Sequence, residues 1–394
     1  MIKGVFLDLD NTLLVNPDSV FAPGYLRLAD PFFAEKWNYP GLSSVILQTI
    51  RAMIGKRDMQ QTNSDVAIDI IAQATEKTGD AIRAGFDAFY ASIYPKLRDC
   101  TQPIPFAVKL VKTLQDLKLT VVIATNPLYP AEAIRQRLAW AGLSDDLSAY
   151  ALVTHAENMH FAKPDPAFYA EALARVGLEP DEVFMVGDNP RNDIEPAQTI
   201  GMHTYTVTDA ADSEFSGSLE HFLEQAESPD WFDMLPPPPL QAAMIEPEMR
   251  GNIGALFGVI ASAQPHFWRQ HPDPQEWSPI QIVCHLVESE IKVQRPRLER
   301  IFAENNPFLP ITKPPLSARD AIPCADEGYP VAVHFMTERM ITLNWLKQLV
   351  PGDWLRPARH STFGLTTLLE MAQFTAQHDR LHINQLCQTL GQCK

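Results

Sequence analysis

The sequence predicts an α/β domain followed by an all-α domain, namely a parallel sheet with an inserted helical segment and then a four-helix bundle. In the first part, short apolar runs alternate with helical stretches, which indicates a parallel sheet that crossover helices bury on both faces. Four consecutive prolines, Pro236 to Pro239, then mark a change of pattern. Beyond residue 240 the apolar residues follow a helical period, and no strand pattern is visible.

Five apolar runs are the predicted strands of the sheet. They are KGVFLDLD, LTVVIATN, ALVTH, VFMVGDN and MHTYTVT. Between Val15 and Pro103 helical periodicity replaces the alternation, which predicts a helical insertion between the first two strands. Ligands of open α/β sheets bind at the carboxyl ends of the strands. Four of the five runs end in polar or acidic residues, so we expect a site at that edge.

The proline run is predicted to be a spacer between two domains. Proline cannot continue a helix or a central strand, and several in a row form a stiff extended segment. We therefore expect an α/β domain at 1–230, a linker at 231–244 and a helical domain at 245–394. A proline-rich surface loop within one domain is the alternative.

Four helices are predicted in the last part of the chain. Their expected ranges are about 247–264, 279–304, 330–349 and 365–390. Ser278 is the expected N-cap of the second, and Pro279 takes its first helical position, where the missing N–H costs nothing. Four helices with one longer connection form a bundle.

Composition and charge exclude several classes of protein. The net charge of −16 argues against a general nucleic-acid binder, which needs a basic face. No apolar run approaches the roughly 18 to 20 residues of a membrane helix, and the start, MIKGVFLDLDNTLL, resembles neither a signal peptide nor an anchor. We therefore expect a cytoplasmic protein without a membrane partner. Scattered cysteines without a C-x-x-C predict reduced thiols. These are Cys100, Cys284, Cys324, Cys387 and Cys393.

Two carboxylates with one residue between them follow the first strand. Asp8 and Asp10 stand in DLDNT, with Thr12 two residues further on. Carboxylates held this close repel each other unless they bind a cation or share a proton. Mg²⁺ suits them because it prefers oxygen ligands and leaves room for a substrate phosphate. Taken alone, the motif could instead be a solvated acidic turn without a bound cation.

Polar groups at the other predicted strand ends strengthen the cation site. Thr125 and the backbone N–H of Asn126 could donate to phosphate oxygens, and Lys163 is a point charge able to neutralise phosphate. Asp188 and Asp193 lie in the loop after the fourth run. Each could be an ordinary cap or surface residue, but their order and placement favour a phosphate site.

The motifs DLDNT, ATN, AKPDP and GDNPRND together resemble the four motifs of the haloacid dehalogenase superfamily, which is dominated by Mg²⁺-dependent phosphatases. The resemblance covers about residues 1–230 and implies a Rossmann-like sheet whose helical cap, about 15–103, closes over the site. It also implies the roles of the site residues. They are Asp8 as the nucleophile that forms an aspartyl-phosphate, Asp10 as the general acid and base, Thr125, Asn126 and Lys163 as phosphate-binding groups, and Asp8, the Asp10 carbonyl, Asp188 and Asp193 as the Mg²⁺ site. Asp10 and Thr12 favour phosphate over halide, because an alkoxide leaving group needs a proton and a halide does not.

Three histidines are candidate ligands of a second metal. His378 and His382 share one face of the fourth predicted helix, and antiparallel packing could bring His285 of the second helix opposite them. Asp379 or the hydroxyl of Thr375 could support them. Ordinary interior or surface histidines are the alternative.

The stretches WSPIQIVCHLVESE and HSTFGLTTLLEMAQFTAQHDRLHINQL resemble the DinB family of four-helix bundles, over about residues 245–390. That resemblance implies that His285, His378 and His382 bind a divalent transition metal such as zinc, nickel or iron. Some members of the family use low-molecular-weight thiols. His360, in ARHSTFG, is not expected to be a ligand.

The function predicted from the whole sequence is that of a Mg²⁺-dependent phosphatase acting on a small phosphorylated metabolite, with a second metal-binding domain. Two alternatives stay open at this point. One is a metal-dependent thiol transferase led by the bundle, and the other is a bundle that serves as a structural or binding module.

Overall fold

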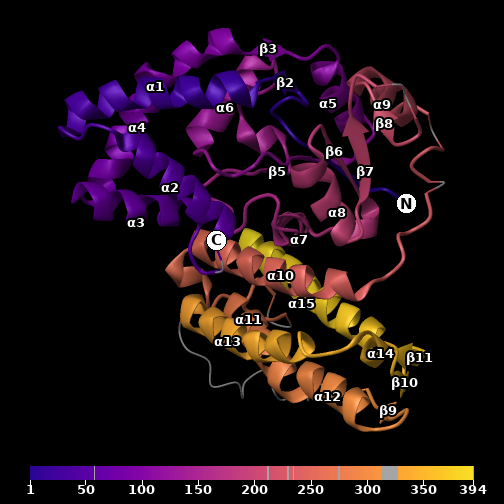
Figure 1. The fold of residues 1–394 in the computed structure, drawn as a ribbon. Coiled ribbons are helices and arrows are strands. Elements are labelled where there is room, and N and C mark those ends of the chain that lie inside the picture. Colours follow the sequence, from indigo (N-terminus) through magenta and orange to yellow (C-terminus); the bar gives the residue numbers. More distant parts are fainter. Residues whose placement is uncertain are drawn as a thin grey trace. The chain divides into compact units, whose positions relative to one another are not determined.

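The computed structural model describes residues 1–393 except for 57, 211–212, 229, 234, 274–275 and 312–326. The chain divides into two compact units. The first comprises Met1–Ala172 and Pro180–Pro238, and the second comprises Leu173–Glu179 and Pro239–Lys394. The first holds a parallel sheet with an inserted set of helices and the second a helical bundle (Figure 1), so the predicted fold class is confirmed.

A six-stranded parallel sheet organises the first unit, in the order β5-β4-β1-β6-β7-β8. The strands are β1 Gly4–Leu7, β4 Thr120–Ile123, β5 Leu152–Val153, β6 Val183–Gly187, β7 His203–Val207 and β8 Ser216–Gly217. All five predicted runs contain a strand. β8 was not predicted, because two small residues carry no apolar pattern. β1 lies between β4 and β6 and is buried along its whole length.

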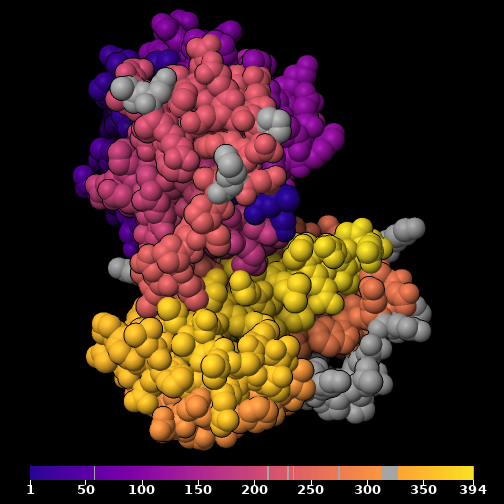
Figure 2. All heavy atoms as spheres, turned by 90° about the vertical axis from the view of Figure 1, so that its right-hand side faces the viewer, coloured from indigo at the N-terminus to yellow at the C-terminus, as the bar shows by residue number. Residues whose placement is uncertain are grey.

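Helices cover both faces of this sheet. Their bounds are α5 Ala107–Asp116, α6 Ala131–Trp140, α7 Ala167–Val176, α8 Glu195–Thr199 and α9 Leu219–Ala226. Figure 1 shows α5 and α9 on one face, and α7 and α8 on the other. In Figure 2, atoms from the start of the chain (indigo) lie beside atoms from its middle (pink) on the surface of the first unit.

A helical insertion separates β1 from β4. Its helices are α1 Asp18–Trp37, α2 Leu42–Gly55, α3 Asn63–Thr75, α4 Gly79–Ser92 and the 3₁₀ helix η1 Tyr94–Cys100. Two short antiparallel strands, β2 Leu14–Val15 and β3 Gln102–Pro103, pair where the chain enters and leaves the insertion. Thr62 starts α3 with a capping box that includes Asp65. Because both ends are tied together, the inserted helices form one body, which we call the cap.

Four long helical segments build the described part of the second unit. They are α10 Ala242–Ser262, the run α11 Pro279–Ser289, η6 Glu290–Gln294 and α12 Arg295–Ala303, then α13 Gly328–Leu346, and α15 Leu368–Gln392, with the short α14 Pro351–Trp354 before the last. The predicted start of α11 is confirmed, since Ser278 forms a capping box with Gln281 and Pro279 follows. An apolar cluster that includes Met249, Leu343 and Ala376 fills the interior.

The structure corrects three details of the predicted bundle. Residues 279–304 are interrupted by the π-helical turn η6. A three-stranded sheet exists where no strand was predicted, formed by β9 Phe308–Leu309, β10 Pro357–His360 and β11 Gly364–Thr367. α15 begins at Leu368 and not at 365, because the preceding residues pair with β10. Strands of two to four residues are too short to show a period of two.

The cysteines and the helix lengths test two further expectations. Cys284 is disulfide-bonded, so the expectation of reduced thiols is wrong there, because sequence spacing does not reveal which cysteines the fold brings together. Cys100, Cys387 and Cys393 are free, and Cys324 lies outside the described residues. Among the described residues, no helix combines the length and apolarity that crossing a membrane requires.

Candidate active site and histidine cluster

The predicted site acids of the first unit lie at the carboxyl edge of the sheet. Asp8 continues directly from β1, and its N–H donates to the carbonyl of Val186 at 2.9 Å. On the other side of β1, the N–H of Ala124 donates to the carbonyl of Leu7 at 2.7 Å. These backbone bonds fix the start of the Asp8 loop between the ends of β4 and β6.

A buried lysine joins two of the predicted site acids. Lys163 Nζ donates to Asp8 Oδ1 at 2.7 Å and to Asp193 Oδ1 at 2.6 Å. The side chain of Lys163 is 1% exposed. Burial alone would lower the pKa of Lys163, but Asp193 and Asp8 raise it well above its usual value. Burial also raises the pKa of Asp8, and Lys163 opposes that shift. The lysine is therefore a buried cation held by two acids that are far apart in the sequence.

Three carboxylates gather around this lysine. Asp8, Asp188 and Asp193 each have an oxygen within 4.8 Å of the other two. Thr12 Oγ1 donates to Asp188 Oδ1 at 3.5 Å. Burial, and then the neighbouring Asp193, raise the pKa of Asp188 to about 6. A Cβ on Gly187 would lie 2.4 Å from the Asp193 carboxylate, so only glycine lets the acid approach the end of β6.

Asp10 is held apart from these three carboxylates. Asn16 Nδ2 donates to Asp10 Oδ1 at 2.7 Å, and Arg137 Nη1 donates to Asp10 Oδ2. The Arg137 side chain is 1% exposed, and its Cζ lies 4.6 Å from the ring centre of Tyr129. The Nε and Nη2 groups of Arg137 are buried without hydrogen-bond partners. Both oxygens of Asp10 are therefore fixed by donors from this chain.

Neither donor to Asp10 was predicted from the sequence. A signal for Arg137 was present, because the arginine stands on the buried side of α6 between Ile134 and Leu138. A buried arginine needs an acidic partner. Asn16 carried no such signal, because its contact depends on the turn after β1.

The predicted phosphate-binding residues of β4 lie at the same edge. Thr125 is 1% exposed, and its carbonyl accepts a 2.6 Å hydrogen bond from Thr154 Oγ1. Asn126 follows, with its Oδ1 buried and unpaired. The loop end of β4 is thus fixed by the neighbouring β5 region beside the end of β1.

In the second unit, the three predicted histidines lie together. One nitrogen from each of His285, His378 and His382 lies within 4.8 Å of the other two. The ring centres of His285 and His382, and those of His378 and His382, are both 4.5 Å apart. α11 supplies the first histidine and α15 the other two. The four-residue spacing and the packing of these helices thus bring all three imidazoles to one point.

The surroundings keep His285 and His382 neutral and orient His382. Burial, and then the other two histidines, lower the pKa of His285 to about 3. Burial, and then His378, lower the pKa of His382 to about 4. Gln385 Oε1 lies 2.8 Å from His382 Nδ1, so Nε2 is the nitrogen of that ring left to bind a metal. The Trp277 ring packs against His285 with centres 4.7 Å apart. Neutral imidazoles are the form that binds metals.

Of the two groups expected to support the histidines, only Asp379 lies near one of them. Asp379 Oδ1 lies 3.7 Å from His378 Nδ1, and Arg339 fixes the same carboxylate. The single proton of the Thr375 hydroxyl faces two acceptors away from the histidines, Gln294 Oε1 at 3.2 Å and the Met371 carbonyl at 3.0 Å, so its suggested role beside the histidines is wrong. The ring of His360 is stacked on Phe363 and is not in the cluster.

Family models match both units of the chain. Residues 2–201 match the model of the haloacid dehalogenase-like hydrolases. Residues 249–386 match the model of the DinB superfamily. The two matches do not overlap, and they confirm both sequence resemblances.

Several phosphatases are similar to the first part of the chain. N-acetylmuramic acid 6-phosphate phosphatase of Pseudomonas putida is 28% identical over 210 residues, which are 52% of this chain and 82% of that protein. A phosphoglycolate phosphatase of Rhodospirillum rubrum is 26% identical over 235 residues, 59% of this chain and 91% of that protein. Among solved structures, Bacillus subtilis YfiT, described as a probable metal-dependent hydrolase with an unusual four-helix bundle topology, aligns at 16% identity over 38% of this chain and 88% of its own, with a TM-score of 0.33.

Proposed function

The chain belongs to the haloacid dehalogenase-like hydrolase family and is a phosphomonoesterase, and we propose that it hydrolyses a small phosphorylated metabolite with Mg²⁺ through an aspartyl-phosphate on Asp8. The observation that carries this proposal is the buried contact of Lys163 with both Asp8 and Asp193. A buried cation beside a carboxylate provides the charge that a phosphate group needs at that position.

The donor set fits a hard divalent cation. Three carboxylates with oxygens within 4.8 Å carry more negative charge than Lys163 alone balances. Oxygen ligands of this kind are those that Mg²⁺ prefers. In the proposal Asp8, Asp188 and the backbone carbonyl of Asp10 hold the ion, and Asp193 supports it. The ion would stabilise negative charge on the transferring phosphoryl group.

The residues of the chain then divide the reaction into two steps. Asp8 attacks phosphorus while the ester P–O bond breaks, and Asp10 gives its proton to the departing alkoxide. Asp10 next takes a proton from water, whose oxygen attacks phosphorus and breaks the bond to Asp8. Inorganic phosphate and free Asp8 result. Thr125, Asn126 and Lys163 bind the phosphoryl oxygens throughout.

Asp10 is suited to this exchange of a proton by the way it is held. Asn16 and Arg137 each contact one of its oxygens. A fixed carboxylate keeps the proton donor at a constant position during both steps, which is a requirement of general acid and base catalysis. Arg137 and Asn16 are positioning residues in this proposal.

For the second unit, we propose that His285, His378 and His382 bind a divalent transition metal such as zinc, nickel or iron. Three imidazole ligands leave coordination positions open for water or a substrate. A thiol transferase and a structural or binding module both remain compatible with such a centre. Loss of a thiol-transfer activity on His285→Ala would favour the transferase.

The main test is a screen of phosphorylated metabolites with added Mg²⁺, run with elemental analysis of the same preparation. Asp8→Asn should abolish phosphate release, because the amide cannot form the aspartyl-phosphate, and should leave the metal content of the bundle unchanged. Asp116→Asn, an exposed acid at the end of α5, is the matched control and should keep full activity. Turnover that survives Asp8→Asn for every ester contradicts the proposal.

A further inference from the structure

A cavity of about 240 Å³ lies between the cap and the carboxyl edge of the sheet in the first unit. The cap contributes residues of α2, α3 and α4 to its wall. The sheet domain contributes the loop after β4, from Leu128 to Pro130, and residues Ala156 and Glu157 after β5. The loop after β4 is the one that begins with Thr125 and Asn126. The cavity therefore adjoins the part of the sheet edge that bears the proposed active site.

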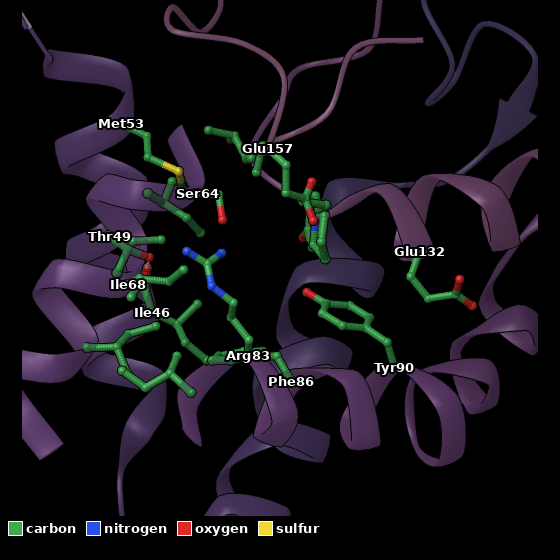
Figure 3. Close-up of a pocket in the computed structure, with 18 of the residues that line it drawn as sticks. Ile46, Thr49, Met53, Ser64, Ile68, Arg83, Phe86, Tyr90, Glu132 and Glu157 are labelled. Carbon is green, nitrogen blue, oxygen red and sulfur yellow. Dashed lines mark hydrogen bonds between the residues drawn. The ribbon is translucent and has the colours of Figure 1, made fainter. Parts of the chain in front are cut away.

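The wall of this cavity is mainly apolar. Figure 3 shows Ile46, Met53 and Ile68 along one side of the cavity, with Phe86 nearby and Tyr90 across from them. Such side chains offer contact area and few hydrogen bonds.

Most polar groups in the wall are already engaged by the protein. Thr49 Oγ1 donates to the carbonyl of Ile46 at 2.7 Å. The Tyr90 and Tyr25 hydroxyls are bonded to each other at 3.0 Å. Glu157 accepts from the N–H of Ala131 at 3.0 Å, and Glu132 accepts from Gln136 at 2.9 Å. A polar ligand would gain little by competing with these internal bonds.

The charged groups of the wall disfavour a second anion on the ligand. Arg83 is the one basic side chain among the described lining residues, and it lies 3.8 Å from Asp65. Its guanidinium projects into the cavity in Figure 3. The lining also contains three acids, Asp87, Glu132 and Glu157. A carboxylate or second phosphate on the substrate would therefore meet more negative than positive charge.

Tyr129 and Arg137 link the cavity to the proposed proton donor Asp10. Tyr129 lines the cavity, and its ring lies against Arg137, which contacts Asp10. Asp10 acts on the oxygen of the leaving group in the proposed reaction. The cavity is thus on the side of the site to which the leaving group projects.

We infer that the substrate is a phosphate monoester of an uncharged, largely apolar alcohol, whose hydrocarbon part occupies this cavity. The inference rests on the proposed phosphatase function and adds the chemical class of the leaving group. A cavity of this volume is slightly smaller than the roughly 300 to 1,000 Å³ of common ligand pockets, so the apolar group is compact. Esters that carry a second anionic group besides the phosphate, such as 2-phosphoglycolate, are poor substrates on this account.

The test is a kinetic series with the full-length protein, Mg²⁺ and methyl, ethyl, butyl and hexyl phosphate, compared with 2-phosphoglycolate. The leaving alcohols differ little in acidity, so the series reports on binding in the cavity. The value of kcat/KM should rise by about fourfold for each added methylene until the cavity is full. It should be at least about tenfold lower for 2-phosphoglycolate than for butyl phosphate.

Variants on α3 assign any preference to the cavity. Ile68→Asp places a carboxylate in the wall and should reduce the ratio of kcat/KM for hexyl over methyl phosphate by about tenfold or more. Ile68→Ala introduces no charge and therefore disturbs folding less than Ile68→Asp. It should reduce that ratio by several-fold. Gln73→Asp adds the same carboxylate to the exposed side of α3 and should leave the ratio unchanged.

The outcomes separate this inference from the function on which it rests. A preference for 2-phosphoglycolate, a flat alkyl series, or a ratio unchanged in both Ile68 variants overturns the inference while the phosphatase function stands. If no ester is hydrolysed with Mg²⁺, the proposed function itself fails, and the inference with it.

Discussion

At position 137 a buried arginine pairs with an acid 127 residues earlier in the chain. Arg137 is 1% exposed, whereas the Asp10 side chain is 28% exposed. An arginine buried to this degree is stable only with a partner, and removal of either partner leaves the other uncompensated. The pair therefore links the stability of α6 with the orientation of the proposed proton donor.

Arg137→Met should lower both stability and turnover. We expect the free energy of unfolding to fall by about 1–3 kcal/mol, less than for a fully buried pair because water reaches Asp10. The loss of activity should appear in kcat more than in KM, since the proposed role of Asp10 is in the transition state. Urea unfolding and steady-state kinetics measure these two effects.

A double-mutant cycle provides the control for Arg137. Once Asp10→Asn has removed the charge, Arg137→Met should cost less stability than it does in the wild-type chain. Strictly additive losses would contradict the assignment of this pair. A rise in KM with an unchanged kcat in Arg137→Met would instead indicate that Arg137 binds substrate directly.

The neutral histidines predict a pH dependence of the metal-free protein. The pKa values of His285 and His382, about 3 and about 4, lie below the usual 6.5. Below about pH 6.5 the unfolded chain takes up protons that the folded bundle does not, so stability falls as the pH drops toward 4. Each histidine contributes up to about 1.4 kcal/mol per pH unit in that window.

The double variant His285→Gln with His382→Gln tests this dependence. In urea unfolding with a chelator, it should lose less stability than the wild type between pH 7.5 and pH 4.5. Above pH 7 the histidines contribute no slope, so the two curves should run parallel there. Parallel curves over the whole range would refute the prediction.

Some of the site residues could be predicted because their sequence patterns are local. Asp8 follows an apolar run directly, and His378 and His382 are one helical turn apart. Their geometry is therefore encoded within a few residues. Asn16 and the Thr375 hydroxyl depend on a turn and on neighbouring helices, which no local pattern describes. The hydroxyl lies within hydrogen-bonding reach of the Met371 carbonyl in its own helix and of Gln294 on η6, and the second contact depends on how the helices pack.

At the scale of elements, the π-helical turn η6 has a structural role in the bundle. It begins with Glu290, which is fully buried and accepts hydrogen bonds from Arg339 and Thr342 of α13. Arg339 also bonds both oxygens of Asp379 on α15. A buried arginine with two acids thus joins three helical segments next to the histidine cluster. The apolar periodicity of residues 279–304 did not predict this turn. A π-helical turn adds one residue to the helix, and one added residue barely shifts the apolar face.

Arg339→Met should destabilise the bundle strongly. The change leaves Glu290 and Asp379 buried without their cation, and we expect a loss of about 3–5 kcal/mol in the free energy of unfolding. Arg300→Met is a matched control, since Arg300 of α12 and Glu304, the residue after that helix, form an exposed pair. Its effect should stay within about 0.5 kcal/mol. Urea unfolding of both variants decides the point, and comparable losses in the two would contradict a role for the buried triad.

At the scale of the whole molecule, each unit contains a hydrophobic core of its own. The apolar cluster around β1 and the cap lies within the first unit, and the cluster around α10, α13 and α15 lies within the second. The alternation of strands and helices predicted the first core, and the helical period after the prolines predicted the second. The small sheet of β9, β10 and β11 escaped prediction because its pairing is non-local and each strand is very short.

Separate cores and separate ligand sets predict separate responses to metals. An ion that binds only the folded form stabilises it by about 2.7 kcal/mol at a concentration one hundred times its Kd. Ni²⁺ or Zn²⁺ at micromolar concentration should therefore raise one thermal transition of the chelator-treated protein, and His285→Ala should abolish that shift. Mg²⁺ at millimolar concentration should raise a different transition, and Asp8→Asn should abolish only this second shift. Differential scanning calorimetry of the wild type and both variants distinguishes the two responses. If either variant removes both shifts, the two clusters do not act as independent metal centres.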